Sequence, residues 1–304
     1  MSGETRLPHW LVKPISDPSA VRRVKETLAT CRLNTVCDEA RCPNRVDCFS
    51  RGTATFMILG DTCTRDCRFC AVRHGTPVEP DPDEPRRVAA GASALDLRFV
   101  VLTSVTRDDL PDGGAAHFAE TVKAVRKALP DSGIEVLVPD FEGRLRDVAT
   151  VLEAAPDVFG HNIETVRKLY GPVRSGADYD RSLAVLREAS SSGGARHVKS
   201  AIMLGLGEDR SEIREALSDL RSAGADVAYL GQYLRPTRAH APVKRFVPPE
   251  EFEEIREEAL SLGFAYVSAG PFVRSSYEAE RVLEQPARPG AAGGRARTGG
   301  ASRR

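Results

Sequence analysis

Six of the seven cysteines of this chain fall into two triplets near its N-terminal end. The first triplet has the spacing C-x4-C-x5-C, and the second has the spacing C-x3-C-x2-C. Thiolates select iron–sulfur clusters, zinc or Cu(I), and a closed zinc or 4Fe–4S site takes four ligands. A group of three cysteines therefore indicates a cluster with one iron left for another ligand or a substrate. The triplets are Cys37, Cys42 and Cys48, then Cys63, Cys67 and Cys70.

The bulk composition argues against several classes of protein. The 304 residues carry 43 basic and 43 acidic side chains, and this balance disfavours nucleic acid as a partner. No apolar run approaches the roughly 20 residues of a membrane-spanning helix, and the N-terminus resembles neither a signal peptide nor a presequence. Cysteines bunched at one end do not form a secreted disulfide framework. We expect a soluble, cytoplasmic protein without a membrane partner.

Short apolar segments alternate with helical patterns along most of the chain. Such alternation predicts an α/β fold with parallel strands and right-handed crossovers, either a partial (β/α)6 TIM-like barrel or a doubly wound sheet. In both, the chemistry gathers at the C-terminal ends of the strands. We expect strands over 55–59, 98–103, 134–138, 158–163, 197–204, 227–231 and 265–268, and helices over 84–96, 115–129, 143–154, 180–191, 211–223 and 250–262.

Two of these helices have clear boundary signals. Ser211 is placed to cap a helix that stops at Gly224. Pro249 opens the last helix, which has acidic residues in its first turn and Gly263 after its last turn.

Four regions follow from these patterns. Residues 1–53 carry the first triplet and are poor in regular pattern, and residues 54–245 hold the strand–helix alternation. Residues 246–284 add a helix, a strand and the segment AGPFVRSSYEAE. Residues 285–304 have no acidic and no large apolar residue, which predicts disorder.

The second triplet directly follows the first predicted strand, ATFMILGDTC. Its loop therefore lies at the C-terminal mouth of that strand, where three thiolates can surround one cluster. A structural zinc loop completed by His74 is the alternative. The spacing, with an aromatic residue before the last cysteine, resembles the radical S-adenosylmethionine (SAM) superfamily. That resemblance implies a 4Fe–4S cluster whose open iron binds SAM and cleaves it to a radical that abstracts hydrogen from unactivated carbon.

The first triplet is less specific by itself, because a small zinc knot or a stabilising cluster also explains it. Its neighbours sharpen the interpretation. The run CDEARCPNRVDCFSRGTATFMILGDTCTRDCRFCAVRHGTP resembles the lipoyl synthase family, as do the later segments VVLTSVTRDDLPDGG, PDVFGHNIETV, GADYDRSL, KSAIMLGLGED, GQYLRP and GPFVRSSYEA. These segments stand in the family's order and cover residues 6–283.

The resemblance implies a second, auxiliary 4Fe–4S cluster on the first triplet. A serine of the R-S-S-Y motif is its fourth ligand in the family; here we expect Ser276, with Ser275 as the fallback. Arg274 would hold the segment or the charged cluster, unless it forms an ordinary surface salt bridge. The implied sulfurtransferase reaction inserts two sulfurs, at the sixth and eighth carbons of a protein-bound octanoyl-lysine, with the auxiliary cluster as sulfur donor.

The resemblance also suggests contacts and partners. Asn162 and Glu164 would bond the ribose or amino group of SAM, Arg174 would pair with its carboxylate, and the backbone beside Phe69 would meet the adenine. The implied protein partners are octanoylated lipoyl carrier domains (E2 subunits of 2-oxoacid dehydrogenases and the glycine cleavage H protein), an electron donor such as ferredoxin or flavodoxin, and cluster-assembly proteins.

Other interpretations stay open at this level. A different radical SAM enzyme could use the auxiliary cluster for electron transfer or another sulfur insertion, although the R-S-S-Y segment disfavours this. A non-enzymatic electron carrier or zinc module would leave the barrel pattern without a purpose. Two loops are ambiguous: 205–208 (GLGE) is either a ligand loop or a tight turn, and the acids of TRDDLPDGG form either a cation site or a capped loop.

Overall fold

The computed structural model describes residues 7–12, 19–39 and 42–291. Its main sheet has eight strands in the order β1-β2-β5-β6-β7-β8-β9-β10. Neighbouring strands pair in parallel, except that β1 lies antiparallel to β2. The strands are β1 (Asn34–Thr35), β2 (Thr53–Ile58), β5 (Phe99–Ser104), β6 (Gly133–Leu137), β7 (Val158–Gly160), β8 (His197–Leu204), β9 (Val227–Gln232) and β10 (Tyr266–Gly270).

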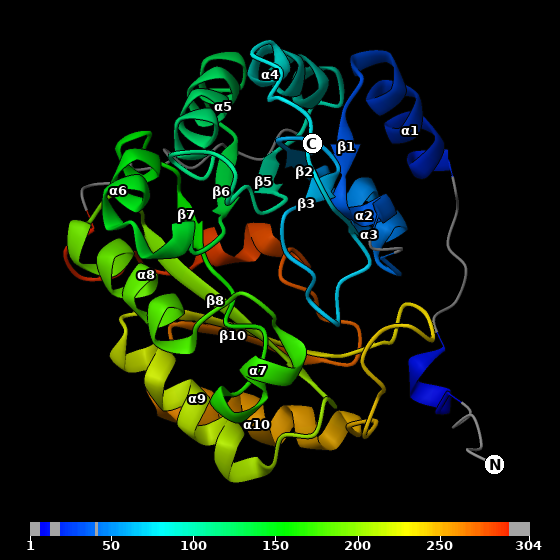
Figure 1. Cartoon of the computed structure of the whole chain (residues 1–304), viewed down its shortest axis with the longest axis vertical. Helices are drawn as coiled ribbons and strands as arrows, with labels where there is room; N and C mark the ends of the chain where they lie inside the picture. The colour runs from blue at the N-terminus through cyan, green and yellow to red at the C-terminus, as the bar shows by residue number, and fades with distance from the viewer. Residues whose placement is uncertain (1–6, 13–18, 40–41, 292–304) are drawn as a thin grey trace, which may run out of the picture.

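Six long helices cover the outside of this sheet and form an arc around the strands (Figure 1). Each follows one parallel strand from β2 to β9, so the chain builds six strand–helix units. They are α4 (Glu84–Ala94), α5 (Ala115–Ala128), α6 (Leu145–Glu153), α8 (Tyr179–Ser192), α9 (Arg210–Ser222) and α10 (Pro249–Ser261). The predicted α/β partial barrel is confirmed, and β10 adds a seventh parallel strand at one edge.

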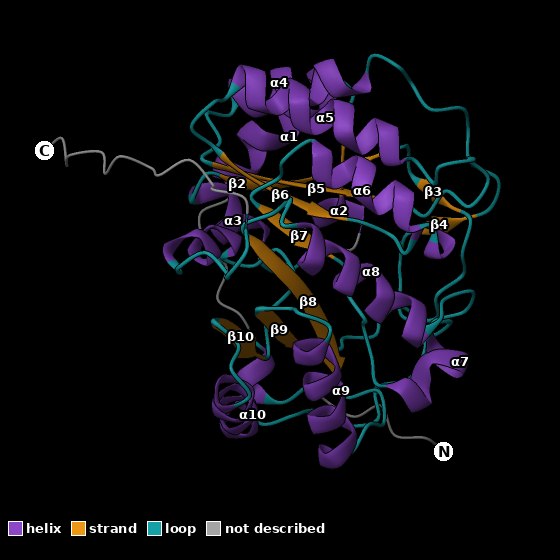
Figure 2. Ribbon diagram, turned by 90° about the vertical axis from the view of Figure 1, so that its left-hand side faces the viewer, coloured by secondary structure: helices purple, strands orange, loops and turns teal. Residues whose placement is uncertain are grey.

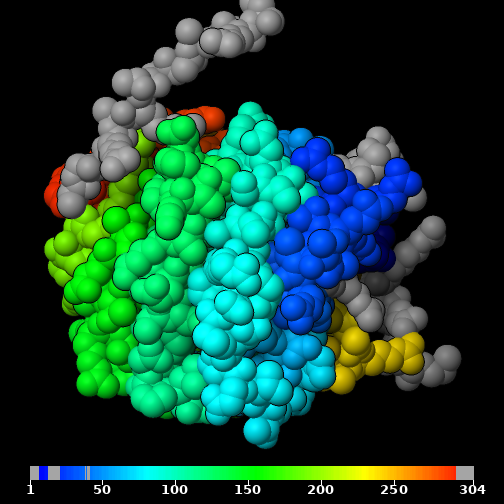
Figure 3. Space-filling view, turned by 90° about the horizontal axis from the view of Figure 1, so that it is seen from above, coloured from blue at the N-terminus to red at the C-terminus, as the bar shows by residue number. Residues whose placement is uncertain are grey.

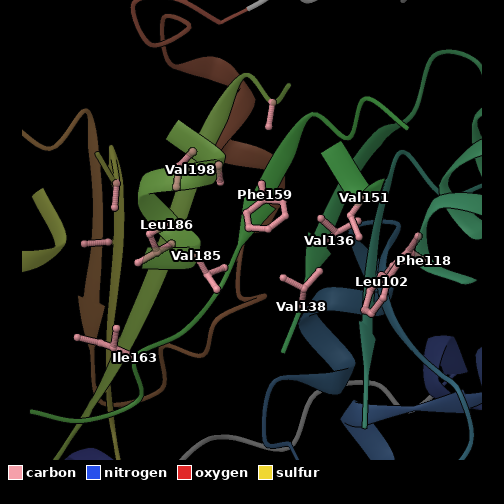
Figure 4. Close-up of a cluster of buried hydrophobic side chains, with 14 of the residues drawn as sticks. Leu102, Phe118, Val136, Val138, Val151, Phe159, Ile163, Val185, Leu186 and Val198 are labelled. Atoms are coloured by element: carbon pink, nitrogen blue, oxygen red, sulfur yellow. The ribbon is translucent and has the colours of Figure 1, made fainter. Parts of the chain in front are cut away.

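The main core lies between the sheet and the outer helices. Figure 2 shows these layers in side view. Leu102 and Phe159 of the sheet and Phe118 and Leu186 of the helices are among its buried side chains (Figure 4). Each large apolar side chain that is fully buried contributes about 1.5–3 kcal/mol. Strands buried on both faces are apolar without alternation, which is why their positions could be predicted.

A second buried cluster fills the inner face of the barrel. Phe99, Val101 and Tyr229 of the strands pack there with Ala279 and Val282 of η4 (Ala279–Glu284). The C-terminal segment therefore closes the interior that the outer helices cannot reach.

The N-terminal region is more regular than the sequence suggested. It contains η1 (His9–Leu11), α1 (Ser19–Cys31), α2 (Val36–Glu39) and α3 (Arg45–Ser50), in addition to β1. Val24 and Leu28 of α1 are buried, and the helix packs against α4 and α3. These elements leave little pattern in the sequence, because α1 has only a narrow apolar stripe and the others are a turn or two long.

The expected disorder after residue 284 does not extend to all of that tail. Among residues 285–291, Arg288 is buried and donates hydrogen bonds to the carbonyl oxygens of Ala189 (3.0 Å) and Ser190. Carbonyls at the C-terminal end of a helix lack partners within it, so this arginine satisfies the end of α8. Residues 292–304 lie outside the described residues.

The helix that begins at Arg210 has a different cap from the predicted one. Asp209, not Ser211, is its N-cap, and it forms a capping box with Glu212. The Ser211 hydroxyl donates to the Asp209 carboxylate at 2.6 Å. In a capping box the N-cap side chain and the glutamate three residues later each accept a hydrogen bond from the other's backbone N–H. Ser211 lies inside the helix and is not in the N-cap position that this exchange requires.

The remaining elements are short. They are β3 (Thr62–Cys63), β4 (Arg73–His74), η2 (Phe141–Gly143), η3 (Arg167–Leu169) and α7 (Tyr170–Val173). In the described ranges, none of the helices has the length and apolar character to cross a membrane.

Candidate functional site

Both cysteine triplets line one cavity of about 570 Å³. Many of its lining residues lie at or just after the C-terminal ends of the parallel strands, which is where the sequence analysis expected the chemistry. All seven cysteines are free thiols. The cavity is lined by every residue predicted for the site: Cys37, Cys42, Cys48, Cys63, Cys67, Cys70, Phe69, Asn162, Glu164, Arg174, Arg274, Ser275 and Ser276.

The loop of the second triplet is fixed by backbone hydrogen bonds. The Cys63 sulfur accepts from the backbone N–H groups of Arg65 (3.4 Å) and Thr106 (3.3 Å). The Arg68 N–H donates to the Val173 carbonyl at 2.9 Å, and the Arg68 carbonyl accepts from Ala241 at 2.7 Å. Figure 3 shows the segment around residue 240 in yellow against the blue N-terminal part of the chain. Hydrogen bonds to ligand sulfurs are one means by which a protein tunes a cluster.

Arg65, which lies in the same loop, ties it to two acidic side chains. Its guanidinium donates to both oxygens of Asp108 (2.7 and 2.9 Å) and of Asp140 (3.0 and 2.7 Å). Although burial raises the pKa of Asp140, the hydrogen bonds and charge of Arg65 lower it to about 2. Paired bidentate contacts of this kind are strong and geometrically specific. The acids of TRDDLPDGG therefore have structural partners: Asp108 binds Arg65, Asp109 binds Arg107, and Asp112 accepts from backbone N–H groups that begin α5.

Three polar residues predicted to contact SAM stand together after β7. Asn162 donates to Glu164 at 3.0 Å. Glu164 has a left-handed backbone (φ 65°), which is strained for a residue with a long side chain. Burial raises the pKa of Glu164, and Arg174 opposes that rise. Arg174 donates to the Tyr170 hydroxyl at 2.7 Å and to the Ile163 carbonyl.

Phe69 lines the cavity beside this polar group. It packs against a small apolar cluster that includes Val173, Leu206 and Tyr233. A flat aromatic side chain and its backbone therefore border the space in front of the second triplet.

The first triplet lies on the N-terminal extension. Cys37 follows β1 and Cys48 is on α3, while the Cys42 N–H donates to the Cys37 carbonyl at 2.9 Å. Burial raises the pKa of Cys37 to about 11 and that of Cys48 to about 12. Ligation needs the thiolate, so cluster uptake here must release protons.

The R-S-S-Y segment reaches the cavity from the C-terminal side. The Ser275 hydroxyl donates to Asn162 at 3.2 Å. The Ser276 hydroxyl lines the cavity without a hydrogen-bond partner in the described part of the chain. Arg274 donates to the Val273 carbonyl at 2.7 Å and lies near Cys42. It pairs with no carboxylate among residues 7–12, 19–39 and 42–291, so the predicted alternative of a surface salt bridge is not found.

The arrangement of the cysteines fits 4Fe–4S clusters better than zinc ions. Across the described ranges, no three histidine, cysteine, aspartate or glutamate side chains converge on the position of one metal ion. His74, the ligand required by the zinc alternative, is 60% exposed and lies beside Asp66. Thiolates that hold a 4Fe–4S cluster bind different iron atoms, so three free cysteines spread around a cavity suit that group.

The glycine-rich loop after β8 is closed by its own side chain. The Glu208 carboxylate accepts from the N–H groups of Gly205 (2.5 Å), Leu206 (3.0 Å) and Gly207 (3.0 Å). These are the groups that an anionic ligand would need. The loop is therefore a tight strand-to-helix turn.

Comparison with known proteins identifies the family. A model of the Radical SAM superfamily matches residues 57–220. A lipoyl synthase of Symbiobacterium thermophilum is 52% identical over 296 residues, which cover 97% of this chain and 92% of that protein. A lipoyl synthase of Deinococcus radiodurans is 52% identical over 285 residues, covering 93% and 86%. This chain belongs to the lipoyl synthase family.

Solved structures support the fold alone. SuiB of Streptococcus suis, bound to the precursor peptide SuiA, aligns with a TM-score of 0.54 at 11% identity and covers 88% of this chain and 58% of that one. The hydrogenase maturase HydG of Carboxydothermus hydrogenoformans aligns at 0.51 and 14% identity, covering 76% and 65%. The fold is thus shared with proteins whose sequences are only 11% and 14% identical to this one.

Some residues that shape the site were missed from the sequence. Asp140 lies three residues after the end of β6, and the rule that strand ends carry site residues could have found it. Arg65 lies within the second triplet, yet nothing in its local sequence indicates which acids it binds. Arg51 and Asn44 contact residues more than 220 positions away, and no local pattern signals such contacts.

Proposed function

We propose that this protein is a sulfurtransferase that inserts two sulfur atoms, at the sixth and eighth carbons, into the octanoyl chain of a protein-bound octanoyl-lysine. One observation carries the proposal: two free cysteine triplets and the serines of the R-S-S-Y segment line the same cavity. A 52% identity to lipoyl synthases over nearly the whole chain supports it.

Cys63, Cys67 and Cys70 would hold the 4Fe–4S cluster that binds SAM. When bound, this group supplies the electron and the radical chemistry that remove hydrogen from unactivated carbon. The residues after β7 would hold SAM itself. Arg174, whose charge acts on Cys67, suits the SAM carboxylate, and Glu164 with Asn162 suits its amino group or ribose hydroxyls. The backbone beside Phe69 would meet the adenine.

Cys37, Cys42 and Cys48 would hold the auxiliary cluster that donates sulfur, with Ser276 as its fourth ligand. The Ser275 hydroxyl is engaged with Asn162, which leaves Ser276 as the better ligand. A hydroxyl oxygen is a harder ligand than a thiolate. It would bind its iron less firmly, which suits a cluster that is consumed. Arg274 would place a positive charge beside Cys42, where a thiolate-rich cluster carries negative charge.

The wall of the cavity suits an extended acyl chain. Apolar side chains, among them Met57, Ala201, Met203 and Tyr229, line it together with the two triplets. An octanoyl chain held there would lie within reach of both groups, and holding reactants together in this way can lower a barrier by several kcal/mol. The same apolar wall excludes water from a reactive intermediate.

The protein partners follow from this chemistry. The substrate lysine would belong to a lipoyl carrier domain, such as that of a 2-oxoacid dehydrogenase E2 subunit or the glycine cleavage H protein. A ferredoxin or flavodoxin would supply electrons, and cluster-assembly proteins would rebuild the auxiliary cluster. We propose a cytoplasmic location for this system.

Two triple variants test the assignment of the clusters. The reconstituted chain should hold about eight iron and eight sulfide, and each variant about four of each. Replacing Cys37, Cys42 and Cys48 with alanine should leave SAM cleavage to 5′-deoxyadenosine intact but abolish sulfur insertion. Replacing Cys63, Cys67 and Cys70 should abolish SAM cleavage. Sulfur insertion by the first variant would overturn the proposal.

A further inference from the structure

The N-terminal and C-terminal extensions meet across the open side of the barrel. The Asn44 amide donates to the Phe272 carbonyl at 2.6 Å. The Arg51 guanidinium donates to Glu278 at 2.8 Å, and the Thr53 hydroxyl donates to Glu280 at 3.0 Å. These contacts flank the R-S-S-Y segment on both sides, so they determine where its serines lie relative to the first triplet.

Arg51 is held rigidly by its own backbone. Its N–H donates to the carbonyls of Asp47 and Cys48 (both 3.2 Å) and ends α3. Its carbonyl accepts from the Arg98 guanidinium at 2.9 Å. Cys48 lies one helical turn before it, so the side chain of Arg51 starts from a fixed position relative to that thiol.

The side chain of Arg51 connects three groups. Its carboxylate partners are Glu278 and, at 3.5 Å, Glu280. Its guanidinium lies 5.1 Å from the centre of the Tyr277 ring. Its backbone lies one helical turn after Cys48, at the end of α3. Its positive charge also opposes the rise that burial causes in the pKa of that thiol.

Two nitrogens of this guanidinium can donate a further hydrogen bond. Nη2 is buried and has no hydrogen-bond partner among the described residues, and Nε has no contact of this kind there beyond its 3.5 Å ion pair with Glu280. Leaving a buried donor unsatisfied destabilises a folded protein. A sulfur of Cys48 that is a thiolate, as in a bound cluster, would be a stronger acceptor than the thiol.

The backbone of the paired acid is strained. Glu278 has a left-handed conformation (φ 51°), directly after Tyr277. Such a conformation is unfavourable in a residue other than glycine and persists where surrounding contacts impose it. The ion pairs of Glu278 with Arg51 and with Arg281 (3.0 Å) are those contacts.

We propose that Arg51 is a positioning residue for the auxiliary cluster: it joins Cys48 to the segment that follows Ser276 and so holds the serine against the first triplet. The inference rests on the proposed function, because it assumes a cluster at that triplet. Arg51 does not touch substrate. Its fork of donors can meet a carboxylate and a sulfur at the same time, which the single ammonium of a lysine cannot reproduce.

The test isolates the auxiliary cluster. In a full-length parent with Cys63, Cys67 and Cys70 replaced by alanine, only the first triplet can bind a cluster. Iron and sulfide are counted, the reduced cluster is examined by electron paramagnetic resonance, and iron loss to a chelator is timed. Hydrogen exchange of residues 272–284 reports the docking of the segment. Arg51→Gln is compared with Arg51→Lys and with Arg281→Gln, which breaks a bond to the same Glu278 without facing Cys48.

We expect Arg51→Gln to lose iron about tenfold faster than the parent, because supporting partners of metal ligands contribute about 10–100-fold in affinity. Its resonance spectrum should shift and the 272–284 amides should exchange faster. Arg51→Lys should be intermediate. Arg281→Gln should keep the parent's spectrum and rate of iron loss, although its 272–284 amides should exchange somewhat faster because Arg281 also pairs with Glu278. Should Arg51→Gln fail to fold, Glu278→Gln breaks the same bond from the other side and should give the same result.

The outcomes separate the two claims. A parent that binds a cluster, with unchanged iron loss, spectrum and exchange in Arg51→Gln, overturns the positioning role alone. A parent that binds no cluster at all overturns the proposed function and this inference with it.

Discussion

Two adjacent serines illustrate how surroundings separate residues of the same kind. Ser275 donates its hydroxyl to Asn162, whereas Ser276 faces the cavity without a partner in the described ranges. A hydroxyl already engaged in a hydrogen bond would lose that bond on binding iron. Sequence could place both serines in the site but could not choose between them on this ground.

Replacing these serines one at a time should give different enzymes. Ser276→Ala should keep the cleavage of SAM and lose the formation of the doubly thiolated product, because the auxiliary cluster loses its fourth ligand. Ser275→Ala should retain product formation, within about tenfold of the unmodified chain, since one neutral hydrogen bond contributes about 1 kcal/mol. Mass spectrometry of an octanoyl-lysine peptide reads out both variants. Normal product from Ser276→Ala would refute its role as ligand.

His161 should make stability depend on pH. Burial, with a contribution from Arg174, lowers the pKa of its imidazole from 6.5 to about 4. Below pH 6.5 the unfolded chain binds a proton here and the folded protein does not. The stability contributed by the neutral ring is therefore complete above pH 6.5 and is lost as the pH falls from 6.5 to 4.

Urea denaturation at pH 7.5 and pH 5 measures this effect. The difference in the free energy of unfolding between the two pH values should shrink by about 2 kcal/mol in His161→Gln, the amount that 1.5 pH units represent for one proton. His74→Gln, at an exposed position, serves as the control and should leave the difference unchanged. An equal pH dependence in His161→Gln and the unmodified chain would contradict the assignment.

At the scale of elements, the strands and long helices could be predicted because each has a strong periodic or apolar pattern. β8 has the expected bounds, and α10 begins one residue before the expected start. β7 is shorter than expected, Val158–Gly160, and the backbone becomes left-handed at Glu164, four residues after it ends, where Asn162 and Glu164 line the cavity. Among the elements that were missed, α2, α3 and β1 have at most six residues and bury too few side chains to show a period, whereas α1 has 13 residues but only a narrow apolar stripe.

The loop between β8 and α9 depends on one carboxylate. Glu208→Ala would leave the N–H groups of Gly205, Leu206 and Gly207 without their acceptor. Unsatisfied buried donors are costly, so we expect a loss of about 3 kcal/mol in the free energy of unfolding. Chemical denaturation measures this loss. The control is Glu215→Ala, at an exposed position of α9. A loss no larger than the control's would show that the loop holds its shape by other means.

At the scale of the whole molecule, the decisive contacts join segments that are far apart in sequence. The C-terminal segment fills the barrel interior through η4 and bonds the N-terminal extension through Arg51. The motifs predicted that both extensions serve one site. They could not predict which side chains join them, because those partners are set by the closed barrel and not by local pattern.

The docked part of the tail should contribute to stability. A chain ending at residue 284 lacks the Arg288 bonds to the end of α8 and the bond from Arg196 to the Gln285 carbonyl (2.6 Å). Compared with a chain ending at residue 291, it should be about 2 kcal/mol less stable to urea. Arg288→Ala in the longer chain should reproduce much of that loss. Equal stability of the two truncated chains would mean that the docked tail is energetically neutral.

Anaerobic turnover of an octanoyl-lysine peptide tests the central claim most directly. Reconstituted protein is mixed with SAM, a reductant and the peptide, and the products are identified by mass spectrometry. The account predicts a peptide that carries two new sulfur atoms, with two 5′-deoxyadenosine molecules formed for each product because each of two unactivated carbons loses a hydrogen. Cleavage of SAM without sulfur transfer, in protein shown to hold both clusters, would contradict it.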